Sequence, residues 1–312
     1  MAIYVNTNVS SLTGRNSLNN VQNSLTTTYQ RLSTGMRINS AKDDAAGLQI
    51  ADRLTTQING LNQGNRNASD GIALAQTAEG ALDEISSMLQ KVRTLAVQAS
   101  TGTLTSDDRA SIKKESDSLV AEITRIATQT TYGGKTILEG GETAPSLTMF
   151  KGDNKAGTLT VQVGANSGDT VNIRVESFVF SQMLDNAGIA AANMNSSAGL
   201  TKASLDGVAN RMTFALDSQS KASAAITTLD ALISQVDEQR ADLGAIQNRL
   251  ESSIRNQSNI ATNESDARSR IRDADFAEES ANLSQQSIIQ QAAASMLMQA
   301  NTRPQLALSL LG

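Results

Sequence analysis

Two stretches of the chain carry apolar residues at spacings that alternate between three and four. This pattern is typical of helices that bury one narrow face in a coiled-coil seam. The stretches have similar lengths, so the two helices can pair antiparallel over their full extent. The first seam consists of Leu54, Ile58, Leu61, Ala68, Ile72, Ala75, Leu82, Ile85, Leu89, Val92, Ala96 and Ala99. The second consists of Ala222, Ile226, Leu229, Leu232, Val236, Leu243, Ile246, Leu250, Ile254 and Ile260.

Between these stretches the pattern changes. A third helix is predicted to begin at Thr105, whose hydroxyl caps the helix while Asp108 reaches back to it. Residues 146–180 alternate apolar and polar, which predicts short strands joined by a turn at Gly164–Asp169. Residues 185–215 are rich in Ala, Asn and Ser, and we expect them to be mostly loop with some helix. The apolar stripe of the third helix consists of Ile112, Leu119, Ile123 and Ile126.

The two ends of the chain carry narrower apolar stripes. The first is predicted to end near Gly35, and the second at Arg303–Pro304. Both are rich in Asn, Gln, Ser and Thr, so a lone helix pair of this kind is marginal in water. We therefore expect these ends to order when several copies of the chain pack together. The stripe residues are Val5, Val9, Leu12, Leu18, Val21, Leu25, Leu32, Phe276, Leu283, Ile289 and Met296.

Together these patterns predict a mostly α fold. Its main feature is a long antiparallel coiled-coil bundle formed by the N- and C-terminal halves, with a small β-hairpin-containing segment in the middle. The expected divisions are terminal helices at 1–40 and 275–312, a bundle at 41–140 and 215–274, and a strand and loop segment at 141–214. Within the 312 residues, prolines occur at 145 and 304 alone, so very long helices are permitted.

Composition excludes several kinds of chemistry. The chain has no His and no Cys, so neither a Ser–His–Asp or Cys–His nucleophile nor a zinc site with nitrogen or sulfur ligands can be built. We expect no catalytic residues, no metal site and no cofactor. The formal net charge is −5 and no basic patch is visible, which argues against nucleic acid as a partner. No run of eighteen apolar residues could span a membrane.

Two acidic pairs could in principle perform acid–base chemistry or bind a metal through oxygen ligands. They are Asp43 with Asp44, and Asp273 with Asp275. Carboxylates also satisfy the free N–H groups at helix N-termini. Because no catalytic partner is visible, we interpret both pairs as helix starts.

Several spaced motifs resemble those of bacterial flagellins. The longest is Leu-Ser-Thr-Gly-Met-Arg-Ile-Asn-Ser-Ala-Lys-Asp-Asp-Ala-Ala-Gly-Leu at 32–48, and others lie at 90–98, 163–166 and 241–249. The tail adds Ala-Arg-Ser-Arg-Ile-Arg-Asp-Ala-Asp-Phe-Ala at 267–277 and Gln-Ala-Asn-Thr-Arg-Pro at 299–304. The middle segment is short compared with the outer domains of many flagellins, so the chain resembles a compact member of the family.

The resemblance implies a non-enzymatic subunit that polymerises with copies of itself into the flagellar filament for swimming motility. In that arrangement the stripe residues of the two ends pack in the innermost filament core, and the segment at 141–214 lies on the outer surface. A flagellar export chaperone, the filament cap and the hook–filament junction proteins are implied partners. The resemblance also implies an extracellular protein. Because the first residues lack the basic and apolar regions of a signal peptide, we expect export by another route, the flagellar type III apparatus.

The family also implies recognition by Toll-like receptor 5. The matching positions are Lys91, Leu95 and Glu115. Many flagellins have Arg where this chain has Lys91, and Lys keeps the positive charge but loses the planar hydrogen-bonding fork.

Two alternatives remain open from the sequence. A hook–filament junction protein or another axial flagellar protein would share the terminal helices. An enzyme or ligand-binding protein built on a helical bundle would instead show a polar cluster inside the seam. Assembly of the purified protein into filaments would separate these possibilities.

Overall fold

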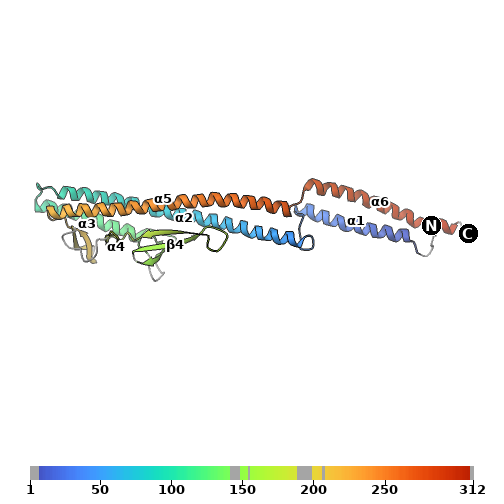
Figure 1. The fold of residues 1–312 in the computed structure, drawn as a ribbon, viewed down its shortest axis with the longest axis horizontal. Coiled ribbons are helices and arrows are strands. Elements are labelled where there is room, and N and C mark those ends of the chain that lie inside the picture. Colours follow the sequence, from blue (N-terminus) through green and yellow to red (C-terminus); the bar gives the residue numbers. More distant parts are fainter. Residues whose placement is uncertain (1–6, 141–147, 154, 188–198, 206–207, 310–312) are drawn as a thin grey trace. The chain divides into compact units, whose positions relative to one another are not determined.

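The computed structural model describes residues 7–140, 148–153, 155–187, 199–205 and 208–309. Six helices and seven strands occupy these residues (Figure 1). The helices are α1 (Val9–Thr34), α2 (Ala45–Ala99), α3 (Ser106–Gln129), α4 (Phe180–Asn186), α5 (Gln219–Arg272) and α6 (Phe276–Ser309). The strands are β1 (Thr131–Tyr132), β2 (Lys135–Thr136), β3 (Lys151–Asp153), β4 (Ala156–Gln162), β5 (Thr170–Glu176), β6 (Leu200–Leu205) and β7 (Val208–Phe214).

The chain divides into two compact units. The terminal unit consists of Met1–Asn59 and Ile260–Gly312, and the central unit consists of Gly60–Asn259. Helices α2 and α5 contribute residues to both units. None of the helices in the described part of the chain is long and apolar enough to cross a membrane.

In the central unit, α2 and α5 run antiparallel, as the sequence predicts. Side-chain contacts join Asn65 to Ser258, Glu79 to Gln247, Asp83 to Arg240, and Arg93 to Asp230. As the residue number in α2 increases, the number of its partner in α5 decreases by nearly the same amount. This relation is expected for two helices that run antiparallel along their length. The mostly α bundle fold predicted from the sequence is confirmed.

The predicted seams coincide with the core of the central unit. The side chains of Leu82, Ile85, Leu89, Leu229, Leu243 and Leu250 are fully buried. Helix α3 adds Val120 and Ile123 to the same core. Its most buried face lies partly one position later than predicted, because Val120 and Ala127 are buried while Leu119 and Ile126 are half-buried. The capping box between Thr105 and Asp108 is present, as predicted.

The predicted strands at 146–180 are also present. Strands β3, β4 and β5 form an antiparallel sheet, and β4 pairs with β5 from Ala156 opposite Glu176 to Gln162 opposite Thr170. The turn between them rests on α2, where a Cβ on Gly64 would lie 2.0 Å from the carbonyl oxygen of Val163. A Cβ on Gly60 would lie 2.8 Å from Cβ of Ala165. Glycine is therefore required at these helix positions so that the turn can approach the backbone.

The prediction for residues 185–215 was wrong in part. Strands β6 and β7 form a hairpin where we expected mostly loop, while residues 188–198 lie outside the described residues. Local composition is overridden here by burial, since Leu200, Met212 and Phe214 are nearly or fully buried. The ring of Phe214 packs edge-on against Phe180, with centroids 5.3 Å apart.

The predicted end of the last helix was also wrong. Helix α6 continues through Pro304 to Ser309. A proline interrupts a helix because it lacks an N–H and crowds the preceding turn. The carbonyl that loses its donor is that of Ala300, and it accepts a hydrogen bond from the Asn8 side chain instead.

Candidate assembly surface

Helices α1 and α6 pack side by side in the terminal unit (Figure 1). Two hydrogen bonds between described side chains link them. Arg31 donates a hydrogen bond from Nη1 to Oε1 of Glu279 at 2.9 Å, and Thr28 donates to Oε1 of Gln286 at 3.4 Å. Within α1, Leu25 and Thr28 are the buried residues. A helix pair that buries so little apolar area has little to stabilise it alone.

The segment that follows α1 is hydrogen-bonded to the segment that joins α5 to α6. Gly35 ends α1 with a φ of 68°, a left-handed conformation that favours glycine. Its carbonyl accepts from the N–H of Ala274, while the carbonyl of Arg272 accepts from the N–H groups of Arg37 and Ile38. Arg37 also donates through its guanidinium to the carbonyl of Ile271. The long motif at 32–48 thus holds the ends of α1 and α5 together, a role that its residue types did not reveal.

Three of the four carboxylates in the acidic pairs serve as turn or helix-start residues, while Asp273 takes part through its backbone, which bridges to Met36. Asp44 accepts from the N–H of Gly47 at the start of α2, and Asp275 accepts from the N–H groups of Ala277 and Glu278 at the start of α6. The Asp43 carboxylate accepts from the N–H groups of Asn39 and Ser40. These hydrogen bonds, foremost that from the Ser40 N–H, hold the pKa of Asp43 below its ordinary value. Among the described residues, no group of three acidic side chains could hold a metal ion.

Exposed apolar side chains are concentrated in the terminal unit. Apart from Val97, every large hydrophobic that the described residues expose lies in this unit. The most exposed are Met296 at 67%, Met298 and Ile288 at 66%, Val9 at 60% and Phe276 at 59%. Apolar surface left open to water in this quantity marks a site of association.

The predicted stripe residues divide into three groups. Leu25 is buried within the single chain, with 6% of its surface exposed. Leu18, Val21, Leu32 and Leu283 are half-buried. The remaining described members are exposed and are Val9, Leu12, Phe276, Ile289 and Met296, while Val5 lies outside the described residues. The single chain thus leaves half of the described stripe residues exposed and fully buries only one of them.

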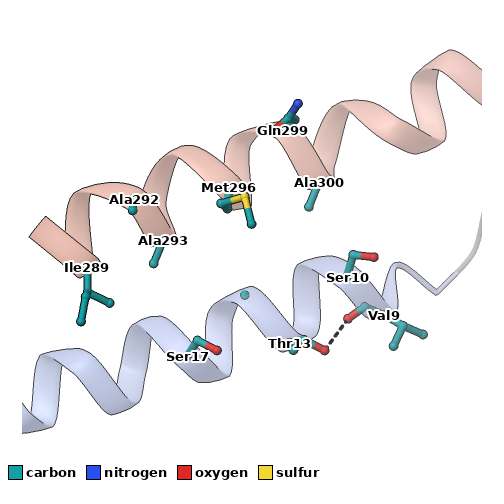
Figure 2. Close-up of a pocket in the computed structure, with 11 residues that line it drawn as sticks. Val9, Ser10, Thr13, Ser17, Ile289, Ala292, Ala293, Met296, Gln299 and Ala300 are labelled. Atoms are coloured by element: carbon teal, nitrogen blue, oxygen red, sulfur yellow. Dashed lines mark hydrogen bonds between the residues drawn. The ribbon is translucent and has the colours of Figure 1, made fainter.

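A groove of about 750 Å³ lies between the far ends of α1 and α6 (Figure 2). Ile289, Ala293, Met296 and Ala300 line it from α6, while Val9 is among the residues that line it from α1. Figure 2 shows these α6 side chains on the side of the helix that faces α1. The α6 wall is mostly apolar and the α1 wall carries small side chains, among them Ser10, Thr13 and Ser17, so the groove is suited to packing against another apolar surface.

The proposed receptor positions lie in the central unit. Lys91 and Glu115 are exposed on α2 and α3, and Leu95 is half-buried against the core. Near them on α2, the exposed Arg93 pairs with Asp230 of α5 at 2.5 Å. The Asp230 carboxylate raises the pKa of Arg93 above its ordinary value.

Two structural side chains were missed in the reading of the sequence. The first is Gln239, whose amide lies on α5 against the edge strand β5. It donates to the carbonyl of Arg174 and accepts from the N–H of Glu176, both at 3.0 Å. The spacing of the second seam gave a signal, because Gln239 stands three residues after Val236 and four before Leu243. A polar residue at a seam position indicates a buried polar partner.

The second is Asn8. Its side chain caps α1 through Oδ1 and donates to the carbonyl of Ala300 at 2.8 Å. The sequence signal was Pro304, which guarantees a carbonyl without its helical donor four residues earlier.

Comparisons with known proteins find matches at both ends of the chain. Residues 5–143 match the bacterial flagellin N-terminal helical region, and residues 226–311 match the bacterial flagellin C-terminal helical region. Flagellin A of Vibrio cholerae is 38% identical, and polar flagellin C of Vibrio parahaemolyticus is 37% identical. Both alignments cover 100% of this chain and of the relative. They extend over 378 and 387 positions, so these relatives carry residues that this 312-residue chain lacks.

A solved structure described as a flagellar hook-associated protein from Vibrio parahaemolyticus shares the fold. It is 15% identical with a TM-score of 0.54, and the match covers 74% of this chain and 100% of that one. At this identity the likeness concerns the fold alone. The family matches and the full-length relatives favour a filament subunit over the axial alternative. They also exclude the enzyme alternative, because the family is structural. The chain belongs to the bacterial flagellin family and is a structural subunit of the flagellar filament.

Proposed function

We propose that the terminal unit forms the innermost core of the filament and that its exposed apolar residues pack against neighbouring copies of the chain. The observation that carries this proposal is the confinement of exposed large hydrophobics to that unit, with Val97 as the exception among described residues. Burying such a side chain contributes about 1.5–3 kcal/mol. Each subunit offers several of them, so repeated contacts along a polymer can stabilise it.

The roles of the chain's segments follow from this proposal. The helices at 1–40 and 275–312 carry the core contacts, the bundle at 41–140 and 215–274 surrounds them, and the segment at 141–214 lies outermost. Contacts between unlike surfaces of successive copies generate an open helix in place of a closed ring. The filament places the protein outside the cell.

Several partners belong to the same proposal. An export chaperone, the filament cap and the hook–filament junction proteins would engage the chain before and during assembly. Toll-like receptor 5 would contact Lys91, Leu95 and Glu115. Lys91 and Glu115 are exposed, which supports access, while Leu95 offers part of its surface.

The assembly role can be tested with a matched pair of charge substitutions on α6. Ile289 is 41% exposed and lines the groove, and Gln291 is exposed two positions later, on the opposite side of the helix. Neither substitution buries a charge within the single chain. We expect Ile289→Asp to abolish filaments in electron micrographs and Gln291→Asp to keep them, with unchanged monomer circular dichroism for both. Normal filaments from Ile289→Asp would overturn the proposed packing face.

A further inference from the structure

Both ends of the Asn8 amide are engaged. Its Oδ1 accepts from the N–H of Ser11 at 3.1 Å, which caps the first turn of α1. Its Nδ2 donates to the carbonyl of Ala300 on α6 at 2.8 Å. The opposite orientation of the amide would place Nδ2 against the N–H of Ser11 and Oδ1 against a carbonyl. Both contacts would then be repulsive, so the two partners fix the amide together.

The carbonyl of Ala300 needs this donor. In a regular helix it would accept from the N–H of the residue four positions later, and that residue is Pro304. Helix α6 nevertheless continues to Ser309. An amide that reaches over from α1 therefore satisfies a carbonyl that its own helix leaves without its usual donor.

We propose that Asn8 is a positioning residue that fills the hydrogen-bond gap created by Pro304 and thereby fixes the axial register of α1 on α6. This hydrogen-bond gap occurs at one position of α6, because proline occurs at no other position of that helix. The cap likewise occurs at one position of α1, its start. Arg31 and Glu279 link the two helices near the end of α1 and the start of α6. The Asn8 bridge fixes the register at the other end of the pair, where small side chains line both helices.

Asparagine alone among the preferred cap residues can do both tasks. Ser and Asp cap a helix equally well, but Ser is too short to reach across, and Asp has no N–H to donate. Asp would also place a negative charge beside a carbonyl oxygen. A purely capping role predicts that Asn8→Asp is harmless or stabilising, since a carboxylate suits a helix N-terminus. The proposed role predicts the opposite.

The test measures the critical subunit concentration for filament assembly. We expect Asn8→Asp and Asn8→Ser each to raise it by about tenfold, the effect of leaving one carbonyl without a partner. The uncharged Ser variant controls for the added charge. Restoring the helical donor with Pro304→Ala should remove the need for the bridge. In that background, Asn8→Asp should change the critical concentration by less than about twofold.

A second readout reports the register without relying on assembly. A Cβ on Gly14 would lie 3.9 Å from Cβ of Leu297, within the range that a disulfide spans. The chain has no cysteine, so Gly14→Cys with Leu297→Cys forms a single pair. We expect this pair to oxidise readily in the chain that keeps Asn8, several-fold more slowly with Asn8→Asp, and readily again when Pro304→Ala is added.

The two readouts distinguish failure of the register role from failure of the proposed core role. Only the assembly measurement depends on the proposed function, whereas disulfide formation does not. The expected oxidation differences with unchanged assembly would refute the core role of the terminal unit and keep the register role. The inference is overturned if Asn8→Asp raises the critical concentration and slows disulfide formation as much in the presence of Pro304→Ala as in its absence.

Discussion

Arg31 and Glu279 form the charged link between α1 and α6. Nη1 of Arg31 lies 2.9 Å from Oε1 of Glu279, and the Glu279 side chain is only 9% exposed. Glu279 also stands in the first turn of α6, where a carboxylate interacts favourably with the helix dipole. Because the Arg31 side chain remains 31% exposed, water screens part of this attraction.

Removing Arg31 alone should therefore destabilise the filament more than removing Arg31 and Glu279 together. Arg31→Leu leaves a buried carboxylate without its cation, and we expect a loss of about 1–2 kcal/mol in filament stability. Adding Glu279→Leu should recover part of that loss. Thermal disassembly of filaments, followed by light scattering, measures both. The double variant would contradict this account if its filaments were less stable than those of Arg31→Leu, by as much as Glu279→Leu alone destabilises them.

Leu243→Asp should unfold the central unit. The Leu243 side chain is fully buried at the seam, so an aspartate there would be an unpaired buried charge costing several kcal/mol, roughly the margin of a whole domain. Ala245 is exposed two positions later, and Ala245→Asp serves as the control. Melting of the monomer by circular dichroism checks the pair. Similar melting temperatures for the two variants would disprove the assigned register.

Gln239→Leu should loosen the contact between the sheet and α5. It leaves the carbonyl of Arg174 and the N–H of Glu176 without the partners seen here, at a cost of about 1–3 kcal/mol. The expected sign is faster hydrogen exchange at Glu176, with little change at Ile173, whose strand partner is Leu159. Asn248→Leu, at an exposed position of the same helix, is the matched control. Unchanged exchange at Glu176 would refute the edge-covering role.

The capping box of α3 should respond to acid. Hydrogen bonds from the Thr105 hydroxyl, then from its N–H, hold the pKa of Asp108 below the ordinary value of 3.8. A carboxyl with a lowered pKa stabilises the fold above its unfolded pKa, and this stabilisation is lost as the pH falls through the folded value. We expect Thr105→Val to raise the Asp108 pKa toward 3.8, and Thr105→Ser to leave it low. Titration of the Asp108 carboxyl by NMR decides between these results.

A short polar tag between Ser167 and Gly168 should permit assembly and swimming. These residues are exposed at the tip of the turn between β4 and β5, within the segment proposed to lie outermost. The same tag after Leu25 or after Ala292 should block both, because it interrupts α1 or α6. If filaments form with the tag after Leu25 but not with the tag after Ser167, the proposed radial order of the segments is reversed.

The sequence predicted those parts of the fold that depend on local periodicity. The burial of Leu229, Leu243 and Leu250 follows from regular spacing, and the Thr105 cap follows from residues three positions apart. The bridge between Asn8 and Ala300 joins residues 292 positions apart, and the local pattern around Asn8 gives no sign of it. Strands β6 and β7 were missed for a similar reason, because burial of β7 against α3 and α4 outweighs the local composition of the hairpin.

The central claim is that neighbouring subunits bury the apolar face of the terminal unit. A cryo-electron microscopy reconstruction of the filament at side-chain resolution tests it most directly. The account predicts that α1 and α6 lie at small radius, with Val9, Ile289 and Met296 covered by neighbouring copies, and that the turn at Ser167 lies at the outer surface. Helices α1 and α6 at large radius, with these three side chains still facing solvent, would contradict it.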